Sequence, residues 1–61
     1  MREFYGKRVV VLAANGRVFE GGVEDCFFPE DNDGRESIVV KTLAGDLVEF
    51  CADDIGCVLV F

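Results

Sequence analysis

The sequence predicts an all-β fold, in which residues 1–61 form one small antiparallel barrel of five strands as a single domain. Apolar residues make up 51% of the chain, which is too many for a disordered segment. They come in short runs separated by turn residues, a pattern typical of strands and not of helices. The connections between these runs are short, so neighbouring strands are expected to pair antiparallel.

The first two runs form the predicted hairpin. Residues 8–14 are rich in valine and are followed by Asn15-Gly16, a dipeptide typical of a two-residue hairpin turn in which both residues take a positive φ. The second strand, residues 17–27, is long and is interrupted by Gly21-Gly22. Paired glycines inside a strand indicate a bulge or a sharp bend, so one strongly bent strand is expected to serve both halves of the barrel.

The rest of the chain continues as a meander that ends in a short helical turn and a last strand. A proline, a glycine and several charges mark the one clear loop, and glycine marks the next turn. Ile55 is expected to plug the barrel. The predicted elements are the loop 29–35, the strand 37–43, the turn 44–46, the strand 47–51, the helical turn 52–54 and the strand 57–61.

Alternation along each strand assigns the two faces of the sheet, because successive side chains point to opposite sides. The residues predicted to face the core are Val9, Val11, Phe19, Gly21, Val23, Ile38, Val40, Val48 and Phe50. The apolar residues left on the outer face are Val10, Leu12, Val39 and Leu43. An outer face this apolar on so small a domain is typical of a surface that binds a partner.

Charge is distributed unevenly along the chain. The net charge is −6, and eleven of the twelve acidic residues follow residue 17. An acidic surface repels phosphates and disfavours nucleic-acid binding, although the basic residues near the first strand leave room for a local basic patch. The simplest role of the net charge is to keep a very apolar small protein in solution.

Three cysteines and the absence of histidine limit the chemistry of the chain. Cys26, Cys51 and Cys57 are too few and too widely spaced for a structural zinc site, so we expect buried free thiols, no metal and no cofactor. The segment 31–34 is similar to a calcium loop, but Val40 stands where a glutamate ligand is required. No apolar leader precedes the first strand, so we expect a cytoplasmic protein that is not membrane-bound.

Catalysis is not expected either. The commonest acid–base residue, histidine, is absent. Ser37 and Thr42 are the only hydroxyl amino acids besides Tyr5, and the sequence offers them no base. Asp53 and Asp54 are adjacent in sequence, so their carboxylates need not converge on one substrate.

The residues 6–11 and 15–23 resemble the first motif of Sm-like proteins, a family of small SH3-like barrels. In that motif, a glycine opens a hydrophobic strand, a turn follows at Asp/Asn-Gly, and a second glycine bends the next strand. The resemblance implies an Sm/SH3-like barrel and ring assembly, in which residues 47–51 of one subunit pair with residues 57–61 of the next. It also implies RNA binding, but two departures weaken this. Phe27 stands near the position of an expected aspartate, and Asp53-Asp54 replace a base-binding cation.

Two functions therefore stay open, together with a third that no motif supports. The first is a non-catalytic interaction module that self-associates through edge strands or binds a protein partner. The second is an Sm-like RNA-binding protein or regulator that uses the basic first strand. The third is an acidic protein that occupies a basic site in place of nucleic acid. Candidate interface residues are Val10, Leu12, Phe28, Val39, Val58, Val60 and Phe61. Candidate nucleic-acid contacts are Lys7, Arg8, Arg17, Asn32 and Arg35.

Overall fold

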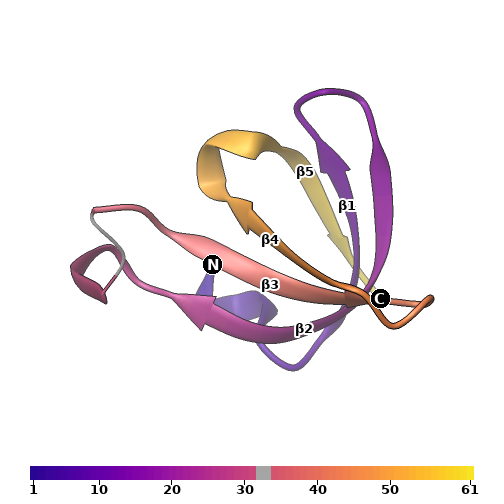
Figure 1. The fold of residues 1–61 in the computed structure, drawn as a ribbon, viewed down its shortest axis with the longest axis horizontal. Helices are drawn as coiled ribbons and strands as arrows, with labels where there is room; N and C mark the ends of the chain where they lie inside the picture. The colour runs from indigo at the N-terminus through magenta and orange to yellow at the C-terminus, as the bar shows by residue number, and fades with distance from the viewer. Residues whose placement is uncertain (32–33) are drawn as a thin grey trace.

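Five antiparallel strands form one sheet, in the order β4-β3-β2-β1-β5, in the computed structural model of the chain (Figure 1). The five-stranded sheet confirms the all-β prediction. The structure describes residues 1–31 and 34–61, apart from the side chain of Asp31. The elements are η1 (Arg2–Phe4), β1 (Arg8–Ala13), β2 (Val18–Phe27), η2 (Pro29–Asp31), β3 (Ser37–Thr42), β4 (Leu47–Cys51), η3 (Ala52–Asp54) and β5 (Ile55–Val60).

The hairpin between β1 and β2 turns over three residues, not the two that the sequence predicts. The Gly16 N–H donates to the Ala13 carbonyl at 2.9 Å, and the Ala13 N–H donates to the Arg17 carbonyl at 2.8 Å. Gly16 has a φ of +89°, which its missing Cβ allows at no steric cost. This is the three-residue loop in which a type I turn is closed by a left-handed glycine. The turn from Thr42 to Asp46 repeats the same hydrogen-bond pattern.

Strand β2 is long because it pairs with β1 along its first half and with β3 along its second half. The two ladders overlap at Gly21 and Gly22. At Gly21 the β3 backbone comes so close that an added Cβ would lie 2.0 Å from the Lys41 carbonyl oxygen. The bulge lies farther along, between Val23 and Asp25, so the glycine pair itself does not form a bulge. Glycine is needed at position 21 because of this close approach.

The turn η3 makes the sheet curl. Strands β4 and β5 lie at opposite edges of the sheet, yet only Ala52–Asp54 separates them in the chain (Figure 1). The Ala52 N–H donates to the Glu36 carbonyl at 2.9 Å, and the Ala14 N–H donates to the Asp54 carbonyl at 2.7 Å. These bonds fix η3 between the start of β3 and the end of β1. Within the described residues β4 does not pair with β5, so the sheet is curled but not closed into a barrel.

The core lies on the concave side of the sheet. Alternation predicts most of its members: the buried hydrophobic residues, each at most 8% exposed, are Val9, Val11, Ala13, Val23, Ile38, Val40 and Phe50. Phe19 and Val48 also face this side but are only half-buried. The rings of Phe19 and Phe50 meet edge to face, with centroids 5.0 Å apart. Ile55, the predicted plug, is the first residue of β5 and packs against the same core.

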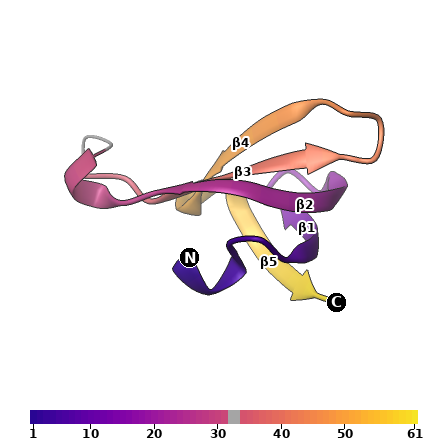
Figure 2. The same cartoon turned by 90° about the horizontal axis from the view of Figure 1, so that it is seen from below.

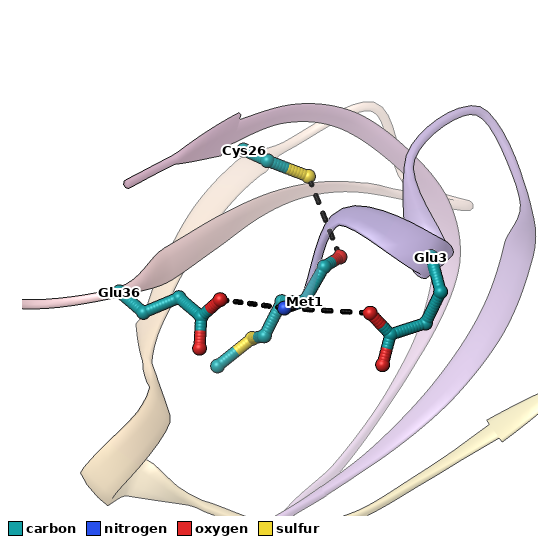
Figure 3. A network of polar contacts seen from close by, with 4 residues as sticks. All are labelled: Met1, Glu3, Cys26 and Glu36. Atoms are coloured by element: carbon teal, nitrogen blue, oxygen red, sulfur yellow. Dashed lines mark hydrogen bonds and ion pairs between the residues drawn. The ribbon is translucent and has the colours of Figure 1, made fainter. Parts of the chain in front are cut away.

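The N-terminal segment covers part of this core, a feature that the sequence does not predict. Met1 and Phe4 pack against the core residues, and Figure 2 shows this segment lying beneath the sheet near β2. The Met1 ammonium donates to Glu36 Oε2 at 2.6 Å and lies 3.5 Å from Glu3 Oε1 (Figure 3). The hydrogen bond to Glu36 raises the pKa of this ammonium above its usual 8.0. The Gly6 N–H donates to the Val23 carbonyl at 3.0 Å, which ties the segment to β2.

Candidate interaction surface

Strand β5 has one free side, because no described strand pairs with it other than β1. The Phe61 N–H donates to the Arg8 carbonyl at 3.0 Å. In an antiparallel ladder, alternate residues direct both backbone groups to the same neighbour. Leu59 and Cys57 therefore bond to β1, whereas the N–H and C=O groups of Val58 and Val60 point away from it. These groups form an edge ready for another strand.

The side chains around this edge are apolar and carry no charge within β5. The pairing of β5 with β1 places Leu59 beside Val10 and Cys57 beside Leu12, on the outer face of the sheet. Val18 of β2 continues this face beyond Leu12. Leu59 is 59% exposed and Phe61 71%. We call this set the β5 face; its members are Val10, Leu12, Val18, Cys57, Leu59 and Phe61.

The position of Cys57 corrects the expectation of buried thiols. Cys26 and Cys51 are half-buried, but Cys57 is exposed on the outer face. The reason is a register shift between Leu12 and Ala13 that leaves Gly56 unpaired. Because of this extra residue, Cys57 lies opposite Leu12 on the outer face of the sheet. All three thiols are free. Burial raises the pKa of the Cys26 thiol, which lies 3.7 Å from the Met1 carbonyl oxygen (Figure 3).

The predicted interface residues fall into separate places. Val10, Leu12 and Phe61 belong to the β5 face. Val58 and Val60 lie opposite Val11 and Val9, so they share the core side of the sheet, and Val58 packs against the core. Val60 is nevertheless 44% exposed because it lies at the sheet edge. The sequence does not single out Leu59, Cys57 or Val18. Only the register with β1 reveals the side of Leu59 and Cys57, whereas Val18 lies two residues before Glu20 and so shares its outer face by alternation.

The other two predicted interface residues lie away from β5. Val39 is half-buried on β3, paired with Asp25 and Glu49, and two strands separate β3 from β5. Phe28 follows β2, and the Arg2 guanidinium stacks over its ring with its carbon 4.8 Å from the ring centre. Phe28 and Arg2 line a hollow of about 380 Å³ together with Tyr5, Asp25 and Cys26. The hollow and the β5 face are therefore distinct surfaces.

The candidate nucleic-acid contacts do not form one cluster. Lys7 directly precedes β1 and Arg8 is its first residue, whereas Arg17 follows the turn at the opposite end of that strand. Arg35 precedes β3, whose first residue pairs with the last residue of β2. Arg8 lies 3.9 Å from a Glu20 carboxylate oxygen, which offsets its charge. Asn32 lies outside the described residues. The cations that are described therefore do not line one groove.

The hydroxyl, thiol and carboxylate side chains are the remaining groups with catalytic or metal-binding chemistry. Ser37 is fully buried, and its hydroxyl donates to Glu49 Oε2 at 2.8 Å, so it cannot reach a substrate in this structure. No group of three metal-binding side chains occurs in residues 1–31 and 34–61. No helix in these same ranges is long and apolar enough to cross a membrane.

Comparison with known proteins gives no family for this chain. No protein-family model, no curated protein and no solved structure matches it. What can be inferred about its function therefore rests on its own residues and their arrangement.

Proposed function

We propose that this chain is a non-catalytic interaction module that self-associates through the edge of its last strand, β5. The observation that carries the proposal is the free side of β5, an uncharged strand that adjoins the apolar β5 face. Natural proteins usually protect such edges with charges, prolines or covering segments, because an open apolar edge pairs with other chains. Strand β5 contains neither a charged residue nor a proline. Pairing with another copy would protect it instead.

The proposal includes an Sm-like small barrel as the fold. It is supported by a second strand shared between two neighbours, and by a helical turn that carries the chain from one edge of the sheet to the other. Both features agree with the resemblance of residues 6–11 and 15–23 to Sm-like proteins. Such a small chain also has little core, so burial between copies would add to its stability.

RNA binding is the weaker alternative. Single-stranded nucleic acids bind in positively charged grooves with aromatic platforms. Here the described cations are dispersed, and the chain carries a net charge of −6. Two of the cations already contact rings of the chain itself: Arg2 lies over Phe28, and Arg17 lies over Phe19.

The substitution Leu59→Lys tests the proposal. Leu59 is 59% exposed and lies on the β5 face, so lysine should leave the fold intact but place a charge at the edge. The matched control is Leu43→Lys in the turn before β4, where leucine is 66% exposed. Light scattering coupled to size-exclusion chromatography should show multimers for the wild type and for Leu43→Lys, and monomers for Leu59→Lys.

Two outcomes would count against the proposal. A wild-type chain that stays monomeric up to its solubility limit would reject self-association. Binding of a short single-stranded RNA by fluorescence anisotropy, weakening steeply with added salt, would instead favour the RNA-binding alternative.

A further inference from the structure

The free backbone groups of β5 are spaced so that a second copy of the same strand can satisfy them. Val58 and Val60 each direct one N–H and one C=O away from β1, as the ladder position of Phe61 requires. If two β5 strands run antiparallel with Val58 opposite the second copy's Val60, each N–H meets a C=O. This register pairs every outward-directed N–H and C=O group of Val58 and Val60. It also leaves Gly56, at the register shift, outside the new ladder.

The same register is symmetric, because Leu59 then lies opposite Leu59 of the second copy. Two-fold pairs are the commonest oligomers, and in them each surface patch meets its own copy. Leu59 bonds to β1 through its backbone, so the two Leu59 residues would form a non-hydrogen-bonded pair, with Cα atoms about 4.5 Å apart. Cys57 would lie opposite the second copy's Phe61. The β5 faces of both copies would then join into one apolar surface.

Charge favours β5 over β4 as the strand that meets its own copy. Glu49 lies in the middle of β4 and is exposed, and Asp46 precedes that strand. Two β4 strands side by side would bring like charges close together, which destabilises a sheet. Strand β5 contains no charged residue. For two molecules that each carry a net charge of −6, contact through an uncharged strand keeps repulsion low.

We infer that a second copy of this chain binds antiparallel to β5 about a two-fold axis at Leu59, so that one sheet continues through both copies. This inference rests on the proposed function, because it names the partner and the geometry of the same edge. It differs from the ring assembly implied by the Sm-like resemblance, in which β5 would meet β4 of the neighbour.

A cysteine placed on the axis tests the inference. In a background of Cys26→Ala, Cys51→Ala and Cys57→Ser, the substitution Leu59→Cys puts two thiols on facing Cα atoms. A separation of about 4.5 Å falls within the range that a disulfide spans. Mild oxidation should convert most of this variant into a covalent dimer on a non-reducing gel. The matched control is Leu47→Cys on the edge of β4, where leucine is 66% exposed; it should stay largely uncross-linked.

The outcomes separate this inference from the proposed function. A monomeric wild type would overturn both. A multimeric wild type whose Leu59→Cys variant forms no covalent dimer, while a Leu47→Cys/Leu59→Cys variant does cross-link, would overturn only the two-fold pairing. Should the cysteine variants fail to fold, isotope-filtered NMR on a mixture of labelled and unlabelled wild type decides. Contacts between Leu59 methyl groups of different chains are expected, and contacts from Leu59 to β4 residues instead would refute the two-fold.

Discussion

Substitution of Gly21 by alanine should strongly destabilise the fold, whereas the same change at its neighbour Gly22 should not. An alanine Cβ at position 21 would lie 2.0 Å from the Lys41 carbonyl oxygen, and ordinary contact begins at 3.4 Å. The obstructing atom belongs to the β3 backbone, so it cannot rotate away as a side chain could. Nothing lies within 4 Å of a Cβ at Gly22, which makes Gly22→Ala a matched control one residue away.

The size of the effect follows from this overlap. Strands β2 and β3 would have to separate by roughly 1.4 Å at the Gly21–Thr42 pair. This would stretch the ladder hydrogen bonding of the adjacent Gly22–Lys41 pair, which is ordinarily about 2.9 Å long, beyond its useful range. Overpacking costs about 1–3 kcal/mol, and each lost hydrogen bond adds about 1 kcal/mol. We therefore expect Gly21→Ala to lower the free energy of unfolding by about 2–4 kcal/mol. A chain of 61 residues is expected to have only about 3–9 kcal/mol in total.

Urea denaturation followed by circular dichroism measures both variants under the same conditions. Gly22→Ala should stay within about 0.5 kcal/mol of the wild type or gain slightly, because alanine restricts the unfolded chain. If the free energies of unfolding of the two variants differed by less than about 0.5 kcal/mol, the proposed close approach of β2 and β3 would be refuted.

Two further predictions concern the N-terminal segment and the thiols. The Met1 ammonium has a raised pKa in the folded state, so its stabilising contribution is complete below pH 8 and is lost as the pH rises through the folded value. The melting temperature of the wild type should therefore fall at alkaline pH by more than that of an N-acetylated chain, which keeps only the alkaline loss of stability from Cys26. Equal pH profiles of the two chains would contradict the Met1–Glu36 contact. In thiol labelling under native conditions, exposed Cys57 should react first and Cys26, whose pKa is raised by burial, much later. If mass spectrometry of singly labelled protein located the reagent on Cys26, the exposed position of Cys57 would be contradicted.

The strands and most of the core could be predicted from the sequence because they depend on local patterns. Apolar alternation identifies Val9, Val11, Ile38 and Val40, which are all fully buried. The strand ends differ from prediction by one or two residues, and β4 agrees with it. The turns occur where glycine, proline and asparagine predict them, although the Asn15-Gly16 turn is one residue longer than its dipeptide indicates.

The features that could not be predicted depend on contacts between distant segments. Residues 57–61 are apolar throughout, so nothing local distinguishes the core side from the outer side. The register with β1 decides that Leu59 points outward and Val58 inward. The bulge between Val23 and Asp25 likewise depends on the pairing of β2 with β3. Of the interface residues that the sequence predicts, Val10, Leu12 and Phe61 therefore lie on the β5 face, whereas Val58 and Val60 lie on the core side of the sheet.

Self-association through β5 is the central claim, and the mass of the wild-type chain in solution tests it most directly. Sedimentation equilibrium over a concentration series should give a mass that is a multiple of 6.7 kDa and falls toward 6.7 kDa on dilution. A mass of 6.7 kDa at every concentration would contradict the claim.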